Sequence, residues 1–437
     1  MIKKIQIKNF KSIKNINLQL SELNIFCGEN ASGKTSIIHA LLLAAQKTTC
    51  DYSVDGSILK IGELSELRNK NATGDIEIKV DCYNTKKDLI FTRNEDVTQN
   101  KSSKLIVQPD PSDYLPFEKK LFYLSSNRMG VMDTYAKGNY LFGTNGEAVI
   151  DFFYKHQEDF LSQEYMEKFK KAFPNSTISE NSKFIEHIRF WMEYITGENI
   201  SIDSIQYTNQ YTLRFGENIR PINTGSGYSF LLPLIVVCLG AILVGEEHAT
   251  VILENPEIYL HPEAQKKLTD FFVYCKTFIQ LIVETHSEHL LKNILDKQQR
   301  QTKVFVIKKI NSNTKSFPFT HKNFKTYPIS YPEVIYTAFG IASPELHIQL
   351  YGMLHSRFLA QYPQNHYLKC FDGYLAGIPG VPIKTWINVN NGTQYDTLPT
   401  FIRNKIDHPE AKDANNKKYK FTESELKTSI DWMLTLL

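Results

Sequence analysis

The sequence lacks the features that mark secreted, metal-binding and membrane-embedded proteins. Its six cysteines are scattered, with no Cys-x-x-Cys pair and no metal-ligand spacing, so we expect reduced thiols in a cytoplasmic protein. The N-terminal residues alternate between polar and apolar side chains, and so lack the apolar core of a signal peptide. The longest apolar run, residues 230–244, is too short to span a bilayer, so we expect a buried helix and no membrane association.

The net charge and the residue periodicity bear on two further classes of protein, nucleic-acid-binding proteins and coiled coils. The net charge of +3 is too small to indicate a nucleic-acid-binding protein by itself, although a local basic face stays open. The sequence has no internal repeat, no low-complexity tract and no sustained heptads, which argues against a long coiled coil. The 437 residues, of which 42% are hydrophobic, are enough for two or three domains with cores of ordinary size.

The apolar pattern of the first three quarters of the chain predicts an α/β fold. Residues 1–30 and 75–125 alternate as strands do. Residues 250–254 and 278–284 are near-continuous apolar strands joined by a helical segment. Such strands are typical of a parallel sheet covered on both faces, so we expect a βαβ unit here. Residues 303–309 predict one more strand.

The pattern changes near residue 325, which predicts two domains. The first, residues 1–325, includes a charged helical insertion at about residues 145–205. The second, residues 326–437, is expected to be mainly helical, with a loop at residues 387–399.

The segment from Gly28 to Ser36 matches the phosphate-binding loop G-x-x-x-x-G-K-[ST], placed between a strand and a helix. Glycines let the backbone wrap an anion, and successive N–H groups together with the helix N-terminus point at the phosphates. Lys34 would bring a positive charge to the β- and γ-phosphate oxygens, and the Thr35 hydroxyl would be a ligand for Mg²⁺. The expected nucleotide-binding residues are Gly28, Asn30, Ala31, Ser32, Gly33, Lys34, Thr35 and Ser36.

Three further segments offer groups that nucleotide hydrolysis needs. An apolar strand ends in Glu254, which resembles a Walker B acid that holds Mg²⁺. His286 follows another strand and would contact the γ-phosphate, although a histidine at a strand end is often structural. Gly225, Ser226 and Gly227 precede an apolar helix, which makes them a second candidate anion site.

In their order, the P-loop, the glycine–serine segment, "LENPEIYLHP" and "ETHSEHLL" resemble the ABC-type ATPases of the SMC, RecF and OLD group. More narrowly, they resemble the AAA15/AAA21-like bacterial ATPases of phage defence. The resemblance covers about residues 1–310 and implies a P-loop ATPase head with a mixed β-sheet, using ATP and Mg²⁺. It also implies that two heads sandwich ATP, so that Gly225, Ser226 and Gly227 act on the nucleotide of a partner head. Hydrolysis would then require a homodimer or a larger assembly.

The sequence departs from this family at the Walker B motif. Many relatives have Asp-Glu, whereas this chain has Glu254 followed by Asn255, and an amide cannot act as a base. Glu257 is the candidate to replace the missing acid, so we expect slow hydrolysis that serves as a switch. The segment "LSSNRMG" also resembles a family segment. It makes Arg128 either a phosphate or interface contact or an ordinary surface arginine.

The second domain contains a candidate ribonuclease motif. Arg403 and His408 fit the arginine–histidine spacing of HEPN ribonucleases, and Asn404 matches the common form of that motif. The resemblance to PrrC- and RloC-like anticodon nucleases implies cleavage of RNA, with tRNA as one candidate target, and no metal. A neutral histidine would take the 2′-OH proton, and the arginine would stabilise the pentacoordinate phosphate. Such sites are usually formed across a dimer.

A structural interpretation of these residues stays open. Side chains five positions apart on a regular helix point about 140° away from each other, so Arg403 and His408 converge only on an irregular helix or across two chains. They can instead complement the dipole of a helix C-terminus. The protein would then be a regulatory ATPase subunit that gates a separate nuclease, as in Septu- or PARIS-like systems. An OLD-type nuclease domain is not expected, because the tail lacks its glutamate turn and its Asp-x-Asp pair.

Overall fold

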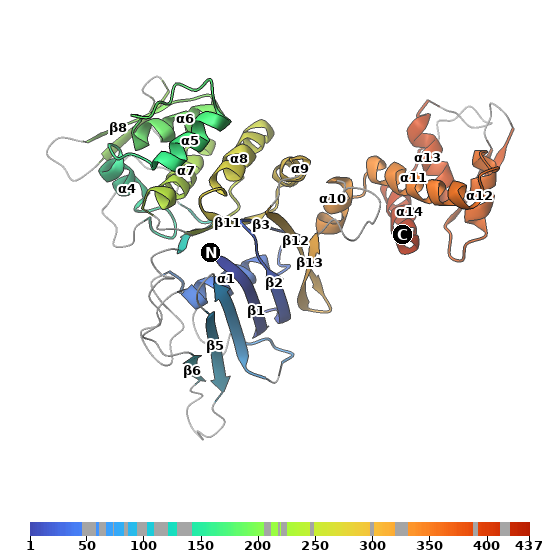
Figure 1. Ribbon diagram of the computed structural model, residues 1–437. Coiled ribbons are helices and arrows are strands. Elements are labelled where there is room, and N and C mark those ends of the chain that lie inside the picture. Colours follow the sequence, from blue (N-terminus) through green and yellow to red (C-terminus); the bar gives the residue numbers. More distant parts are fainter. Residues whose placement is uncertain are drawn as a thin grey trace. The chain divides into compact units, whose positions relative to one another are not determined.

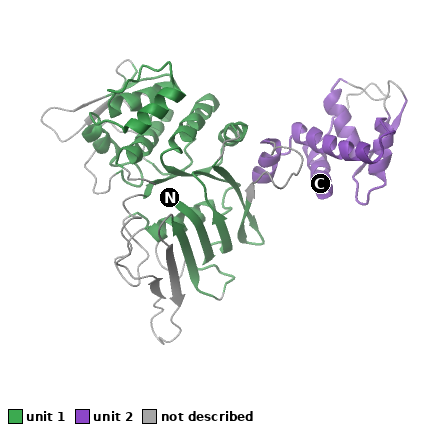
Figure 2. Ribbon diagram, in the orientation of Figure 1, with its two compact units in different colours: residues 1–327 green, residues 328–437 purple. Residues whose placement is uncertain are grey.

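The computed structural model divides the chain into two compact units, residues 1–327 (unit 1) and residues 328–437 (unit 2), coloured separately in Figure 2. The residues that the structure describes are 1–45, 58–60, 67–72, 74–82, 86–93, 103–108, 121–128, 142–204, 211–216, 219, 225–244, 249–297, 301–319, 331–387, 392–410 and 420–437.

A six-stranded sheet forms the centre of unit 1, with the order β13-β12-β3-β11-β10-β7 (Figure 1). Its strands are β3 (Leu23–Cys27), β7 (Leu121–Leu124), β10 (Thr250–Glu254), β11 (Gln280–Thr285), β12 (Thr302–Ile310) and β13 (Asn313–Phe319). Five of them run parallel, and β13 pairs antiparallel with β12. All residues of β3, β10 and β11 are buried, as expected for parallel strands covered on both faces. The carboxyl ends of these three strands meet at one edge of the sheet.

A second, antiparallel sheet of unit 1 has the order β2-β1-β4-β5-β6. Its strands are β1 (Ile2–Phe10), β2 (Ile13–Gln19), β4 (Ile76–Cys82), β5 (Lys86–Arg93) and β6 (Ser103–Gln108). Helix α1 (Lys34–Ala45) is buried along most of its length, because both sheets contribute to the core around it. Ile5 and Ile7 of β1 join this core from one side, and Ile252 and Ile282 of the parallel sheet join it from the other. A helix that is apolar nearly all round is expected in such a place.

Helices pack on the opposite side of the central sheet (Figure 1). They are α4 (Val149–His156), α5 (Gln163–Ala172), α6 (Phe184–Thr196), α7 (Ser226–Val244), α8 (Pro262–Cys275) and α9 (Glu288–Asp296), with a hairpin of β8 (Ile200–Ser204) and β9 (Tyr211–Phe215). Helix α7 begins before the apolar run 230–244, at Ser226, and contacts β7 and β10. Among the described residues, it alone has the length and composition to cross a membrane, yet 67% of its most apolar window is buried inside the protein.

Unit 2 is mainly helical. Its helices are α10 (Tyr331–Phe339), α11 (Pro344–Gln361), α12 (Leu368–Ala376), α13 (Leu398–Asp407) and α14 (Glu423–Leu436), and its strands are β14 (Ile383–Ile387) and β15 (Gln394–Thr397). Side chains from α10 to α14 form a separate hydrophobic core. Together the two units confirm the expected α/β class, with a mixed sheet followed by a mainly helical C-terminal part.

The prediction of a loop at residues 387–399 is wrong at both ends. Ile387 ends β14, and Gln394–Thr397 form β15, while residues 388–391 lie outside the described part. The rings of Trp386 and Tyr395 stack across the two strands, with 4.8 Å between their centroids. A cross-strand aromatic pair of this kind stabilises a hairpin, and the local sequence pattern does not reveal it.

Candidate functional site

The loop between β3 and α1 has a backbone that suits glycine at two positions. Gly28 has a φ of +144° and Gly33 a φ of +105°, conformations in which a side chain is strained. A Cβ at Gly28 would lie 2.2 Å from the carbonyl oxygen of Ile307, and a Cβ at Gly33 would lie 2.1 Å from the Thr314 hydroxyl. The remaining predicted residues of this segment are Asn30, Ala31 and Ser32 in the loop and Lys34, Thr35 and Ser36 in the first turn of α1.

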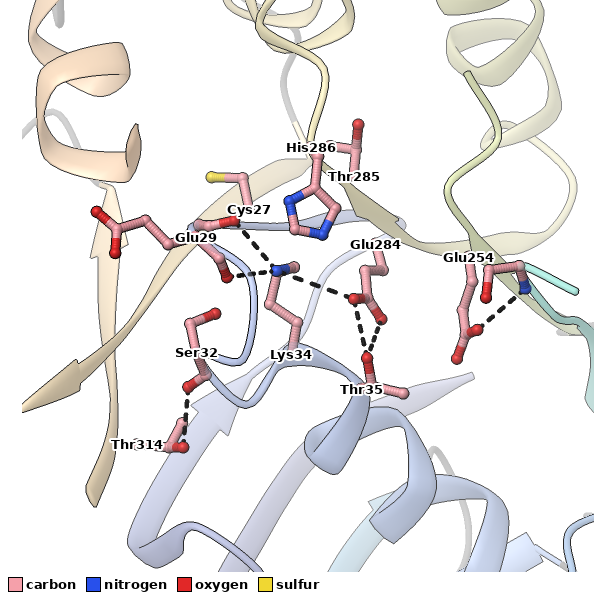
Figure 3. Close-up of polar contacts among 12 residues, drawn as sticks. Cys27, Glu29, Ser32, Lys34, Thr35, Glu254, Glu284, Thr285, His286 and Thr314 are labelled. Atoms are coloured by element: carbon pink, nitrogen blue, oxygen red, sulfur yellow. Dashed lines mark hydrogen bonds and ion pairs between the residues drawn. The ribbon is translucent and has the colours of Figure 1, made fainter. Parts of the chain in front are cut away.

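The Lys34 ammonium is buried against this loop. It donates hydrogen bonds to the carbonyl oxygens of Gly28, at 3.1 Å, and Glu29, at 2.9 Å, and lies 4.0 Å from Glu284 Oε1 (Figure 3). Burial lowers the pKa of Lys34, and the Glu284 carboxylate acts in the opposite direction. A buried ammonium at the N-terminus of a helix favours a phosphate at this position.

Glu284 is a site residue that the sequence analysis missed. It lies on β11, between the P-loop strand β3 and the strand β10. The Thr35 hydroxyl donates to both of its carboxylate oxygens, at 3.0 and 3.2 Å (Figure 3). Burial, and next the neighbouring Glu254, raise the pKa of Glu284 to about 7. The available signal was an acid near the end of a mostly apolar strand, two residues before His286.

Glu254 ends β10 directly beside Glu284 in the parallel register. Its Oε2 accepts a hydrogen bond from the Ser126 N–H at 3.0 Å, and its Oε1 is buried without a partner in the described part of the chain. These carboxylates and the Thr35 hydroxyl are the hard oxygen donors that Mg²⁺ prefers. In the described ranges, no three His, Cys, Asp or Glu side chains gather closely enough to hold a metal.

The same edge of the sheet also holds Asn255, Glu257 and His286. Asn255 has a φ of +44°, donates its N–H to the Glu284 carbonyl at 2.8 Å, and leaves its buried Oδ1 without a partner among the described residues. Glu257 Oε1 accepts from the His286 N–H at 2.9 Å. Burial raises the pKa of Glu257, whereas burial and the charge of Lys34 lower the pKa of His286. The Glu257 carboxyl and the His286 imidazole thus lie close enough to Lys34 to interact with its charge, at the edge of the sheet that holds the phosphate loop.

Arg128 is not a surface arginine in this structure. Its side chain is buried, and it donates to three main-chain carbonyl oxygens: Phe230 at 3.3 Å, Glu254 at 2.9 Å and Asn255 at 3.0 Å. It thereby ties the end of β10 to helix α7. The interpretation as a surface arginine is wrong, because the guanidinium donors are used on main-chain carbonyl oxygens inside the protein, whereas contact with a phosphate or a partner head stays a prediction.

Gly225, Ser226 and Gly227 stand at the start of α7, and they line a pocket of about 570 Å³. Tyr259 and His261, from the turn after β10, line the same pocket. Within the described part of the chain, Gly225, Ser226 and Gly227 make no hydrogen bond to a P-loop residue.

Arg403 and His408 lie at the end of α13 in unit 2. The Arg403 guanidinium pairs with Asp407 at 2.7 Å, on the same helix. His408 caps the helix, its N–H donating to the Asn404 carbonyl, and its ring lies 3.7 Å from Glu410 with 58% of the side chain exposed. Within one chain, each side chain of the pair is thus engaged with an acid rather than with the other.

Comparison with known proteins places most of unit 1 in a family. Residues 23–292 match the family described as "AAA domain, putative AbiEii toxin, Type IV TA system". The DNA replication and repair protein RecF of Lachnoclostridium phytofermentans is 31% identical over 85 residues, which are 19% of this chain and 24% of RecF. The chain thus spans about a quarter of the curated relative that it matches.

Solved structures of low identity are also similar. An Smc head bound to the C-terminal winged-helix domain of ScpA has 15% identity and a TM-score of 0.46, with 74% of this chain and 98% of that chain covered. The SMC head domain from Thermotoga maritima has 12% identity and a TM-score of 0.41, with 73% of this chain and 99% of that chain covered.

Proposed function

The chain belongs to the AAA-domain family named for the AbiEii toxin of type IV toxin–antitoxin systems, and we propose from this premise that it is an ATP-driven switch. One observation supports this function above the others. A glycine-dependent phosphate loop, a buried lysine and two adjacent strand-end acids meet at one edge of the parallel sheet. This is the arrangement that phosphate binding with a divalent cation requires.

Each group has a role in the proposed reaction. The loop from Gly28 to Ser36 binds the phosphates, and Lys34 offsets their charge. Thr35 and Glu254 would hold Mg²⁺, which would supply charge stabilisation at the phosphates. Glu257 holds the attacking water, and His286 contacts the terminal phosphate.

Hydrolysis is proposed to be slow. Asn255 occupies the position after the Walker B acid and cannot take a proton, so Glu257 has to act from two residues further along the chain. Burial raises the pKa of Glu257, which makes its carboxylate a stronger base, yet its Oε1 already accepts a hydrogen bond from the His286 N–H. A site of this kind favours a long-lived ATP-bound state over rapid turnover.

The ATP-bound state is proposed to pair two heads. Gly225, Ser226 and Gly227 lie at a helix N-terminus beside a pocket, and among the described residues they make no hydrogen bond to the P-loop of their own chain. A second copy would supply the phosphate that they cap, which makes the homodimer, or a larger homo-oligomer, the active form.

The output is proposed to be RNA cleavage by unit 2 in an antiphage or toxin system, with Arg403 and His408 as the catalytic pair. The single-chain ion pairs to Asp407 and Glu410 would have to open, as pairing of two chains could bring about. These same ion pairs favour a second candidate. In that alternative, unit 2 is a docking domain and the switch gates a separate nuclease.

RNA integrity in cells that express the chain separates the two outputs. The variants are His408→Ala, Lys34→Ala and His366→Ala, the last a control at another exposed histidine of unit 2. If unit 2 is the nuclease, wild type and His366→Ala degrade RNA, whereas His408→Ala and Lys34→Ala do not. If the wild type leaves RNA intact while the purified chain hydrolyses ATP, the built-in nuclease is refuted and the docking role stands.

A further inference from the structure

We propose that Glu284 makes nucleotide binding by this chain dependent on a divalent cation, by holding the proton of Thr35 and by placing a negative charge beside the phosphate site. This inference rests on the proposed ATP-binding function and adds a residue to it. It is carried by the contacts of Glu284 with the first two residues of α1 (Figure 3).

The first part follows from the geometry of a hydroxyl group. A hydroxyl that binds a cation uses an oxygen lone pair, so its proton has to point to another acceptor. The Thr35 hydroxyl donates to Glu284 at 3.0 and 3.2 Å. That bond directs the hydroxyl proton to β11 and leaves the lone pairs of Thr35 free for a cation. Glu284 therefore acts as a positioning residue for a ligand, a role in which loss of the partner typically lowers metal affinity by about 10–100-fold.

The second part follows from charge. Glu284 is buried, and its Oε1 lies 4.0 Å from the Lys34 ammonium that would face the phosphates. A carboxylate at this distance offsets part of the attraction of Lys34 for a bare polyphosphate. A divalent cation between carboxylates and phosphates reverses this effect, because it is attracted to both. Free ATP is thus disfavoured, and the cation-bound form is selected.

Glu29 provides a matched control. It lies in the same loop and carries the same charge, yet its side chain is exposed and points away from Lys34 in Figure 3. Glu29→Gln removes one acid beside the P-loop without touching Thr35. Glu284→Gln is nearly isosteric and keeps an oxygen that can accept the Thr35 proton, whereas Glu284→Ala removes this acceptor.

The test is calorimetric titration of the full chain with a non-hydrolysable ATP analogue, once with Mg²⁺ and once with EDTA, at about pH 8, where carboxylates are ionised. In Glu284→Gln the analogue should bind more tightly in EDTA than it binds to wild type. Because the variant removes the charge and keeps the acceptor, the ratio of the Kd in EDTA to the Kd in Mg²⁺ should fall about tenfold. Glu29→Gln should keep the wild-type ratio. A general structural defect weakens binding in both buffers, so tighter binding in EDTA distinguishes the proposed role.

Mn²⁺ binding in the presence of the analogue, followed by electron paramagnetic resonance, tests the positioning role without activity. Glu284→Ala should lose more Mn²⁺ affinity than Glu284→Gln, and in a Thr35→Val background the two should differ little. If the wild type needs Mg²⁺ to bind the analogue and Glu284→Gln keeps the wild-type ratio of the Kd in EDTA to the Kd in Mg²⁺, this inference is overturned and the proposed function is not. A wild type that binds the analogue in neither buffer overturns the proposed function with it.

Discussion

Replacing Arg128 by methionine tests whether a single guanidinium joins the end of β10 to helix α7. The change removes donors to three main-chain carbonyl oxygens, a buried one of Glu254 and partly buried ones of Phe230 and Asn255, and keeps much of the side-chain volume. A hydrogen bond from a charged donor contributes about 1.5–3 kcal/mol, and a buried acceptor left unpaired costs a similar amount. Since neighbouring contributions do not add fully, we expect a loss of about 3–5 kcal/mol in the free energy of unfolding.

Urea unfolding followed by tryptophan fluorescence measures this loss in unit 1. The chain has three tryptophans, of which Trp191 is the one in unit 1 and is fully buried. Replacing Trp386 and Trp432 by phenylalanine leaves Trp191 as the reporter. The control is Arg68→Met in the same unit, because Arg68 donates to a single carbonyl oxygen, that of Gly74, in solvent-exposed hydrogen bonds, and its loss should cost less than about 1 kcal/mol. If Arg128→Met costs no more than this control, the tie assigned to Arg128 is refuted.

Two further predictions concern the nucleotide site. Gly33→Ala should destabilise unit 1 by about 2–5 kcal/mol, because the new Cβ adopts a left-handed φ and meets the Thr314 hydroxyl. The control Gly352→Ala, in α11 with open space around it, should stabilise the protein by about 0.5–1 kcal/mol in the same thermal unfolding assay. The second prediction concerns pH. The raised pKa of Glu284 means that the folded chain binds this proton more tightly than the unfolded chain does, so stability falls as pH rises from about 4.5 to about 7. Urea unfolding of Glu284→Gln without nucleotide should therefore show a free energy of unfolding that rises relative to wild type over that range, and parallel pH curves would contradict the assignment.

The P-loop was predictable because its chemistry is written in consecutive residues. Gly28 and Gly33 are needed because the backbone has a positive φ at both positions, and Lys34 and Thr35 follow directly in the sequence. The expected α/β class followed in the same way from apolar strands, since strands such as β10 and β11 are buried on both faces.

Glu284 and Arg128 could not be predicted from local pattern. Glu284 reaches Thr35 only because β11 lies between β3 and β10, and this strand order depends on pairing across more than 200 residues. Arg128 has no sequence signal that separates a buried arginine from an exposed one; its carbonyl partners lie more than 100 residues away. The hairpin of β14 and β15 was missed for a related reason. Trp386 and Tyr395 are separated in the sequence by a polar stretch, so their stacking is seen only in the folded chain.

The most direct test of the central claim is steady-state ATP hydrolysis by the purified chain at several protein concentrations, with wild type, Lys34→Ala and Glu257→Gln compared. The account predicts slow hydrolysis that needs Mg²⁺, a rate per chain that rises with protein concentration as heads pair, and loss of activity in both variants. Phosphate release by Lys34→Ala at the wild-type rate, or no release by wild type at any concentration, would contradict it.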